Sequence, residues 1–283
     1  SEASENYQDV SDPAVYVKVA VKNEPNTFIV IWTTTPWTLP SNLALAMNPN
    51  MDYVKVKDVK TNEIYILANF GLDNLYGKLM LSPKFDLISQ HKGIEFNNVE
   101  YVPIFNYYSH RTFKVVMGDF VEEGSGSGIV HLAPAFGQDD FDVCIQQNII
   151  SIEEVGDYCP LDENGKFIAP VIEYQGENCI STNPKIIERL KQEGKLLKKD
   201  NYKHSYPHCW RTDTPLIYKA VSSFFIKVTA IKERMMELNK KVTWIPETIG
   251  SGRFHNWLKD AKDWGVSRNR FFGTPIPVWM SDD

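Results

Sequence analysis

The sequence predicts an α+β fold built around a closed or nearly closed sheet. Several segments show strand patterns, and helical segments occur among them at irregular spacing. A doubly wound parallel sheet would show regular alternation of strands and helices, and this alternation is missing. With 283 residues, the chain is long enough for one large domain, or for one domain and a smaller unit.

Two kinds of pattern predict the strands. Valine at every second position over residues 15–22 predicts a half-buried strand, and the apolar run at 28–32 predicts a fully buried one. Further strands are predicted at residues 53–57, 63–67, 112–116 and 128–132. Residues 43–47 fit either a strand or a helix, and the first ten residues are polar and are expected to be loose.

Helices are predicted where apolar residues recur at helical spacing after a start signal. Acidic residues open the segment 139–147, where they complement the helix dipole. Asn183 and Pro184 open a second helix that ends near Gly194. Further helices are predicted near residues 231–239 and 254–263.

Composition and charge narrow the class of protein. Hydrophobic residues make up 43% of the chain, which is enough for a packed core. The longest apolar runs are about five residues, whereas a membrane-spanning helix needs about 20, so no membrane role is expected. The net charge of −6 lacks the basic excess of proteins that coat nucleic-acid duplexes, although a local contact with nucleic acid stays open.

The cysteines predict a cellular compartment, and the chain ends predict that the sequence is part of a longer protein. The four cysteines lie far apart without a Cys-x-x-Cys pair: Cys144, Cys159, Cys179 and Cys209. This pattern predicts reduced thiols in a compartment of cytosolic type. The chain starts at Ser1 without a methionine and has an abrupt charged end at Asp283, so we expect a fragment of a longer protein.

The first candidate site is the run of threonines and prolines from Trp32 to Pro40. It leaves a predicted buried strand and is held by two prolines, so short hydroxyl groups stand on a rigid edge. Such groups can hydrogen-bond an ester, a ribose hydroxyl or a water. The alternative is a strand end whose hydroxyls satisfy the backbone.

The second candidate begins with alternating glycine and serine from Gly124 to Gly128, followed by His131 and by acids at 139–142. The glycine run lacks the Gly-Lys-Ser/Thr of a P-loop and precedes a strand, whereas a dinucleotide fingerprint precedes a helix. Its backbone N–H groups could approach a ligand, or it could be a plain hairpin turn. The acids could cap the helix, although one acid remains free to face a pocket.

A third group combines His204, His208 and Cys209. Its spacing is similar to that of metal ligands, but a fourth ligand is not close by in the sequence. We therefore expect no metal site.

Two motifs, in this order, resemble the editing domain of isoleucyl-tRNA synthetases. They are Thr-Thr-Thr-Pro-Trp-Thr-Leu-Pro at 33–40 and the segment from Gly126 through His131 and Ala-Pro-Ala-Phe-Gly to Asp140. The valyl and leucyl relatives tend to carry Thr-Thr-Arg-Pro where this chain has Thr-Thr-Pro-Trp, which favours the isoleucyl family. The segments that look like the return of the inserted domain to a Rossmann catalytic body are 205–211, 214–220, 256–261 and 263–270.

The resemblance implies a β-barrel-like editing domain with peripheral helices over residues 1–200 and a return segment over 201–283. It implies hydrolysis of valine wrongly esterified to the 3′ end of isoleucine tRNA, in the cytoplasm, by a fragment that is a monomer when isolated and otherwise works with the remainder of the synthetase. Neither adenylate-forming signature, His-Ile-Gly-His or Lys-Met-Ser-Lys-Ser, occurs in the sequence. The synthetic site and its ATP are thus expected to be absent, and no cofactor or metal is expected.

The resemblance also implies residue roles. The catalytic residues are Asp140, which anchors the substrate's α-ammonium group, and Thr34 and Thr35, which orient the attacking water. The implied substrate-binding residues are His131, Thr33, Trp37, Thr38, Gly126 and Gly128. Among them, His131 walls the side-chain pocket against isoleucine, and the glycine backbone is a candidate for holding the oxyanion.

Three other interpretations stay open. The chain could edit threonine on valine tRNA, although Pro36 and Trp37 argue against that. It could be a tRNA-binding insert without catalysis. It could also be a metal-dependent hydrolase that uses Asp139, Asp140 and Asp142.

Overall fold

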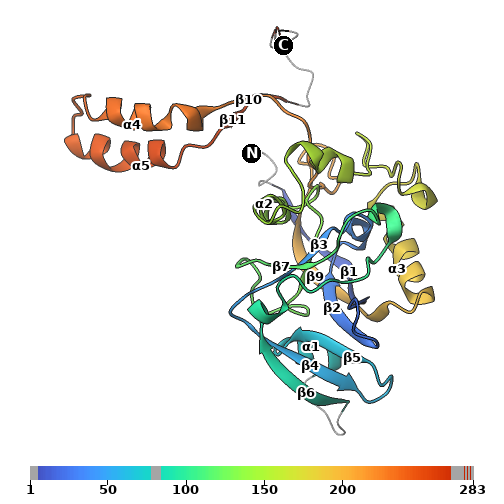
Figure 1. The fold of residues 1–283 in the computed structure, drawn as a ribbon. Coiled ribbons are helices and arrows are strands. Elements are labelled where there is room, and N and C mark those ends of the chain that lie inside the picture. The colour runs from blue at the N-terminus through green and yellow to red at the C-terminus, as the bar shows by residue number, and fades with distance from the viewer. Residues whose placement is uncertain (1–5, 78–83, 269–276, 278, 280, 282–283) are drawn as a thin grey trace. The chain divides into compact units, whose positions relative to one another are not determined.

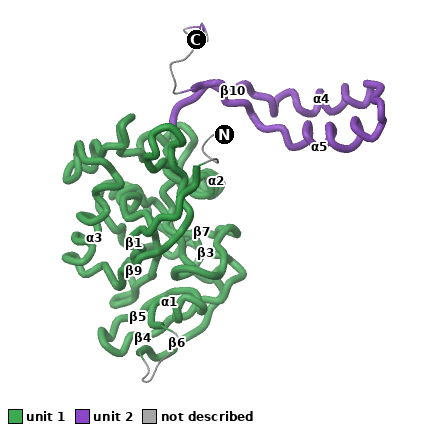
Figure 2. Tube along the Cα trace, turned by 180° about the vertical axis from the view of Figure 1, so that it is seen from behind, with its two compact units in different colours: residues 1–220 green, residues 221–283 purple. Residues whose placement is uncertain are grey.

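The chain forms two compact units, residues 1–220 and 221–283, which Figure 2 colours separately. The computed structural model describes residues 6–77, 84–268, 277, 279 and 281. Residues 201–220, which were expected to be part of a return segment, belong to the first unit. The editing and return roles of the two predicted stretches stay predictions.

The first unit contains two mixed sheets (Figure 1). The strands of the larger sheet are, in spatial order, β6 (Phe85–Lys92), β4 (Asp52–Asp58), β5 (Ile64–Ala68), β2 (Thr27–Thr33), β1 (Tyr7–Ala20) and β9 (Leu196–Pro207). The strands of the smaller sheet are β7 (Val115–Met117), β3 (Ala44–Met47) and β8 (Val130–Leu132). Only the β2–β5 and β3–β7 pairs are parallel among these described strands. Both sheets are open, with β6 and β9 as the edges of the larger one.

Helices complete both units. The first unit has α1 (Gly71–Tyr76), α2 (Gln138–Gln146) and α3 (Asn183–Gln192). Its 3₁₀ turns are η2 (Pro36–Ser41), η3 (Gly93–Phe96), η4 (Asn106–Tyr108), η5 (Glu153–Tyr158), η6 (Ile172–Tyr174) and η7 (Ile180–Thr182). The second unit has β10 (Phe225–Ile226), η8 (Val228–Ala230), α4 (Lys232–Asn239), the π-helical turn η9 (Ile249–Arg253), α5 (Phe254–Lys259) and β11 (Trp264–Gly265). Within the described ranges, no helix is both long and apolar enough to cross a bilayer.

Most of the predicted elements are present, and the α+β class is confirmed. The strands predicted at 28–32, 53–57 and 63–67 are β2, β4 and β5, and those at 112–116 and 128–132 are the shorter β7 and β8. The ambiguous segment 43–47 contains strand β3. The predicted helices at 139–147, 184–190, 231–239 and 254–263 are α2, α3, α4 and α5, although α5 ends at Lys259.

Two expectations were wrong and several elements were missed. The expected closure of the sheet is not found, because the described strands of the first unit form two open sheets and no closed barrel. The first ten residues are not loose from Tyr7 on, because β1 begins there and pairs with β9 from Tyr7–Pro207 to Val17–Leu196. The partner strand lies far along the chain, so local polarity could not reveal the pairing. Helix α1 and the strands β6, β9, β10 and β11 were not predicted from the sequence.

Strand β2 is buried on both faces, and this fixes the position of the segment that follows it. Ile29 and Ile31 join the main core cluster with Leu45 of β3, while Val30 joins a second cluster with Val54 of β4. Burying each such side chain contributes about 1.5–3 kcal/mol. The end of β2 is therefore a rigid support for the threonines that leave it.

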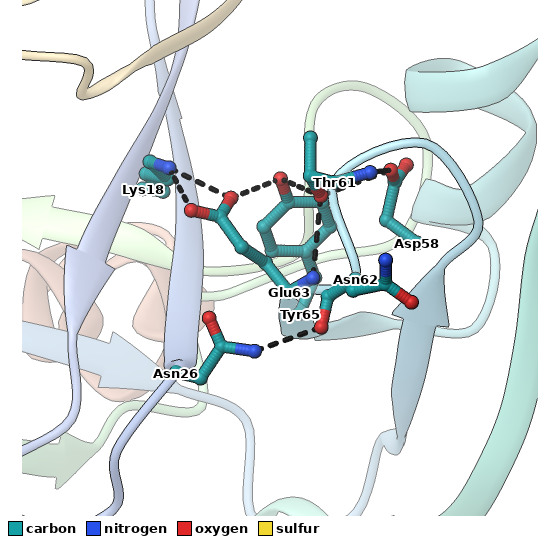
Figure 3. A network of polar contacts seen from close by, with 7 residues as sticks. All are labelled: Lys18, Asn26, Asp58, Thr61, Asn62, Glu63 and Tyr65. Carbon is teal, nitrogen blue, oxygen red and sulfur yellow. Dashed lines mark hydrogen bonds and ion pairs between the residues drawn. The ribbon is translucent and has the colours of Figure 1, made fainter.

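A polar network ties the β4–β5 hairpin to its neighbours (Figure 3). The Lys18 ammonium of β1 donates to the Glu63 carboxylate at 2.7 Å, and the Tyr65 hydroxyl donates to the same carboxylate at 2.7 Å. Asn26 donates to the backbone carbonyl of Asn62 at 2.8 Å. Asn62, in the turn between these two strands, has φ of 59°, a conformation that asparagine tolerates well.

Candidate functional site

The threonine turn, residues 33–38, leaves strand β2 and enters the 3₁₀ turn η2. Pro36 stands at the first helical position, where its fixed φ suits the turn and its missing N–H is not needed. Thr33 and Thr38 are buried, whereas Thr34 and Thr35 are partly exposed. The turn thus holds two of its hydroxyls inside and lets two side chains face outward.

Three of the four hydroxyls of this turn, those of Thr33, Thr35 and Thr38, form a chain of hydrogen bonds. The distances are 3.2 Å between Oγ1 of Thr33 and Oγ1 of Thr35, and 3.3 Å between Oγ1 of Thr35 and Oγ1 of Thr38. Thr38 donates to the backbone carbonyl of Thr35 at 2.8 Å. Because a carbonyl only accepts and each hydroxyl has one proton, we assign the direction Thr33 to Thr35 to Thr38. Each oxygen keeps lone-pair capacity, so the turn can accept further hydrogen bonds.

His131 of β8 completes this chain. Its Nε2 lies 3.0 Å from Oγ1 of Thr38, whose own proton is already donated, so we assign the proton to Nε2 and not to Nδ1. The Nδ1 atom is buried and has no hydrogen-bond partner among the described residues. Burial lowers the pKa of His131 to about 4, so the ring is neutral at pH 7.

Asp140 lies in the first turn of α2, as predicted. Its Oδ2 accepts the backbone N–H of Ala133, two residues after His131, at 2.8 Å. The carboxylate also crowds Gly137, where an added Cβ would lie 2.8 Å from its Cγ. Burial raises the pKa of Asp140 to about 6, with the Ala133 hydrogen bond opposing that shift and Asp139 adding to it. At pH 7 the group is still mostly ionised and can hold a cation.

Aromatic packing brings the threonine turn to the start of α2. The ring of Trp37 meets that of Phe136 edge to face, with centroids 4.9 Å apart. The backbone N–H of Trp37 donates to Oδ1 of Asn183, at the start of α3, at 2.9 Å. The turn is therefore clamped between two helix starts.

The glycine loop, residues 124–128, is exposed at Gly124 and Ser125 and is packed into the protein from Gly126 on. Gly126 and Gly128 both have φ near +70°, and an added Cβ would lie 2.8 Å from the ring of Trp32 at Gly126 and 2.3 Å from Cβ of Ala68 at Gly128. The Gly128 carbonyl accepts the hydroxyl proton of Tyr53 at 2.8 Å. These contacts explain both glycines by close approach, and their predicted role toward an oxyanion stays a prediction.

A cavity of about 120 Å³ lies beside the outward side of the threonine turn. Thr34, Thr35 and Trp37 line it, whereas His131 and Asp140 are not in its lining. The residues that sequence reasoning did not place there are Val10, Asp12, Ile180, Asn183, Tyr206, His208 and Pro215. Rings at every second position from Tyr202 to His208 were a usable signal, because period-two spacing predicts a strand with one ring-bearing face.

The third candidate group has other partners. The Asp12 carboxylate accepts a hydrogen bond from Nε2 of His204 at 2.9 Å, and Nδ1 of His208 lies 2.9 Å from the carbonyl of Tyr206. Among the described residues, no cluster of three or more His, Cys, Asp or Glu side chains is placed to hold a metal ion. Asp142, one of the three acids considered together, accepts from Gln138 on the surface of α2.

Comparisons with known proteins agree on one family. The family model described as class I tRNA synthetases for I, L, M and V matches residues 1–283. An isoleucine–tRNA ligase of Tetrahymena thermophila is 46% identical over all of this chain, which covers 26% of that protein. The cytoplasmic isoleucine–tRNA ligase of Schizosaccharomyces pombe is 44% identical over all of the chain, which covers 27% of it. The chain thus spans about a quarter of the length of these relatives.

A solved structure shares the fold. The editing domain of the cytosolic leucyl-tRNA synthetase of P. knowlesi matches 69% of this chain and 97% of its own, with a TM-score of 0.50 and 11% identity. At this identity, the similarity concerns the fold alone.

Proposed function

Because the chain belongs to the class I tRNA synthetases for isoleucine, leucine, methionine and valine, we propose that it edits mischarged tRNA. The proposed reaction is hydrolysis of the ester that joins valine to isoleucine tRNA. The relatives are named isoleucine–tRNA ligases, and those named cytoplasmic suggest the cytoplasm as its location. The partners would be the 3′ end of the tRNA and the remainder of a synthetase.

The need for such a reaction follows from pocket energetics. One missing methylene changes binding by only about 1–3 kcal/mol, a limit for which isoleucine enzymes are the usual example. A synthetic site therefore admits valine in place of isoleucine. A second pocket that accepts valine and rejects the larger side chain supplies the missing discrimination.

The observation that carries this proposal is the combination of uncharged hydroxyl groups in the threonine turn with a separate charged group, the Asp140 carboxylate. The hydroxyls of Thr33, Thr35 and Thr38 form one chain of hydrogen bonds with the neutral His131. The mostly ionised Asp140 accepts a hydrogen bond from the backbone N–H of Ala133, two residues after His131. A carboxylate suits the α-ammonium group of an aminoacyl ester, through a charge-assisted hydrogen bond. The oxygens of the turn suit the water that attacks the ester.

The direction of the hydroxyl chain supports a role in orienting this water. The hydroxyl protons of Thr33, Thr35 and Thr38 are all donated within the turn, so a water bound there donates its own protons to the threonine oxygens. Its lone pair then remains for the ester carbonyl carbon. The water oxygen ends in the carboxylate of valine, the ester C–O bond breaks, and the ribose oxygen takes a proton. This reaction requires positioning, and it includes no metal, cofactor or covalent enzyme intermediate.

Hydrolysis of charged tRNA tests the proposal. The chain should deacylate valyl-tRNA(Ile) and spare isoleucyl-tRNA(Ile), and Asp140→Asn should lower the rate on the valyl ester about a hundredfold through loss of the charged anchor. Asp142→Asn, on the exposed side of the same helix, is the matched control and should leave the rate unchanged. In the unmodified chain, the rate should fall as the pH drops through about 6, the pKa of Asp140.

A second variant tests the proposed wall of the side-chain pocket. His131→Ala should increase attack on the correct isoleucyl ester. Equal loss of both esters in the unmodified chain, or a valyl rate unchanged by Asp140→Asn, contradicts the proposal. If His131→Ala still spares isoleucine, other residues build the wall.

A further inference from the structure

Strand β9 carries a column of rings on one face. Tyr202, His204 and Tyr206 occupy alternate positions of β9, which point to the same side of a strand, and His208 continues this spacing directly after the strand ends at Pro207. The successive ring centroids lie 5.7, 5.7 and 6.0 Å apart. Trp32 of β2 extends the series, with its ring 5.2 Å from that of Tyr202. We call these five residues the ring column.

The ring column runs from the surface to the cavity beside the threonine turn. Tyr202 is 37% exposed, whereas His208 is 7% exposed. Tyr206 and His208 line the same cavity as Thr34 and Thr35. The column thus connects an accessible ring with the hydroxyls assigned to the reaction.

Several of the rings are held in place by hydrogen bonds. The Tyr206 hydroxyl donates to the carbonyl of Leu216 at 2.6 Å, and His204 donates to Asp12 at 2.9 Å. A ring that is already fixed loses little conformational entropy when a planar group stacks on it.

Strand β9 is an edge of its sheet and carries three lysines, of which Lys198 pairs with Asp200. Lys199 and Lys203 are exposed, and neither forms an ion pair with another described residue. Proteins that bind single-stranded nucleic acid combine rings for the bases with cations for the phosphates. Lys199 and Lys203 lie on the other face of β9 from the rings, together with Ser205, so the ring face offers the stacking half of this composition, in a chain whose net charge is −6.

We propose that the ring column is a stacking track for the single-stranded 3′ end of tRNA, which it guides toward the threonine turn. This inference rests on the proposed function, because that function requires the same RNA end to reach the same turn. Rings stack on any base, so the track binds without reading sequence.

The test compares a long substrate with a minimal one in the 283-residue chain. Tyr202→Leu keeps apolar bulk and removes the ring, so it should raise KM for valyl-tRNA(Ile) about tenfold with kcat unchanged. Hydrolysis of valyl-adenosine, which lacks the preceding nucleotides, should not change. Tyr202→Phe should restore the original KM, and Ser205→Ala, on the opposite face of β9, is the matched control.

Direct binding decides the inference independently of catalysis. In fluorescence anisotropy, a short single-stranded RNA should bind Tyr202→Leu about tenfold more weakly than the unmodified chain or Ser205→Ala.

The outcomes separate the two proposals. Equal RNA binding by the unmodified chain, Tyr202→Leu and Ser205→Ala overturns the track, as does an equal rise in KM on valyl-adenosine. If the unmodified chain hydrolyses neither ester, the editing proposal fails, while RNA binding still decides whether the ring column is a track.

Discussion

The threonine turn and the glycine loop adjoin two contacting strands, β2 and β8, but they use their backbone and side chains in opposite ways. In the threonine turn, hydroxyls bond to one another and keep oxygen lone pairs for further partners. In the glycine loop, missing side chains let the backbone pack against Trp32 and Ala68. The difference teaches that a sequence motif typical of ligand binding can mark either a polar surface or a tight packing contact.

The largest effect expected from this comparison is on Gly128. Gly128→Ala should lower the free energy of unfolding by about 2–5 kcal/mol, because φ of +72° is strained for alanine and the new Cβ would lie 2.3 Å from Cβ of Ala68. Chemical denaturation measures the loss. Gly156→Ala, at an exposed glycine with nothing within 4 Å of an added Cβ, is the control.

If Gly128→Ala keeps its stability and loses ester hydrolysis, the conclusion that the glycine loop serves packing alone is wrong. In that case the glycine loop would belong to the reacting site, as first predicted from its backbone N–H groups. A destabilised variant that retains its selectivity between valyl and isoleucyl esters at low temperature supports a packing role.

The next effect concerns Thr38, in the middle of the hydroxyl chain. Thr38→Val preserves shape but leaves Nε2–H of His131 and the hydroxyl proton of Thr35 without their acceptor. The free energy of unfolding should fall by about 1–3 kcal/mol, the usual penalty for unpaired buried groups. Thr38→Ser retains the hydroxyl and should lose clearly less; similar losses in both variants would mean that the assigned chain of donors is wrong.

The smallest effect is a dependence of stability on pH. The pKa of His131 is lowered to about 4, so its contribution to stability is lost as the pH falls from about 6.5 to 4. The pKa of Asp140 is raised to about 6, so the folded chain takes up this proton first and gains stability as the pH falls from about 6 toward 4. The two contributions oppose each other in the unmodified chain.

Asp140→Asn removes one of these contributions and so reveals the other. Its free energy of unfolding should fall more steeply with acid than that of the unmodified chain, by at most about 1 kcal/mol per pH unit between 6 and 4. Denaturation curves at pH 7, 6, 5 and 4 measure the difference. Parallel curves would show that the Asp140 carboxylate is not shielded from water as its pKa indicates.

Local patterns were enough for elements whose own residues decide their burial. The apolar run in β2 and the alternation in β4 and β5 predicted those strands, since each packs a face defined by its sequence. The outer half of β1 and the whole of β9 were missed because most of their residues are partly or fully exposed and pair mainly with each other. Such a pairing depends on two segments far apart in the chain, which no local window compares.

The residues of the candidate site likewise include some that the sequence predicted and some that only the fold brings there. The threonines and His131 were predicted from residue type, and the structure joins them through Thr38. The predictions could not include Asn183, Tyr206 and His208 beside the turn, because their proximity depends on the positions of α3 and β9. Resemblance to a family named the residues of its own motifs but not those that the fold adds from elsewhere.

The pairing of β1 with β9 sets a distance in discrete steps. Tyr7 at the start of β1 lies opposite Pro207 at the end of β9, so the two-stranded ribbon formed by β1 and β9 begins at this residue pair. Adding two residues to each strand would lengthen the ribbon by about 7 Å and keep every side chain on its original face, whereas adding one would turn the faces over. The length of the paired strands β1 and β9 can therefore vary among relatives only in steps of two residues per strand, if each face of the ribbon is to keep the same side chains.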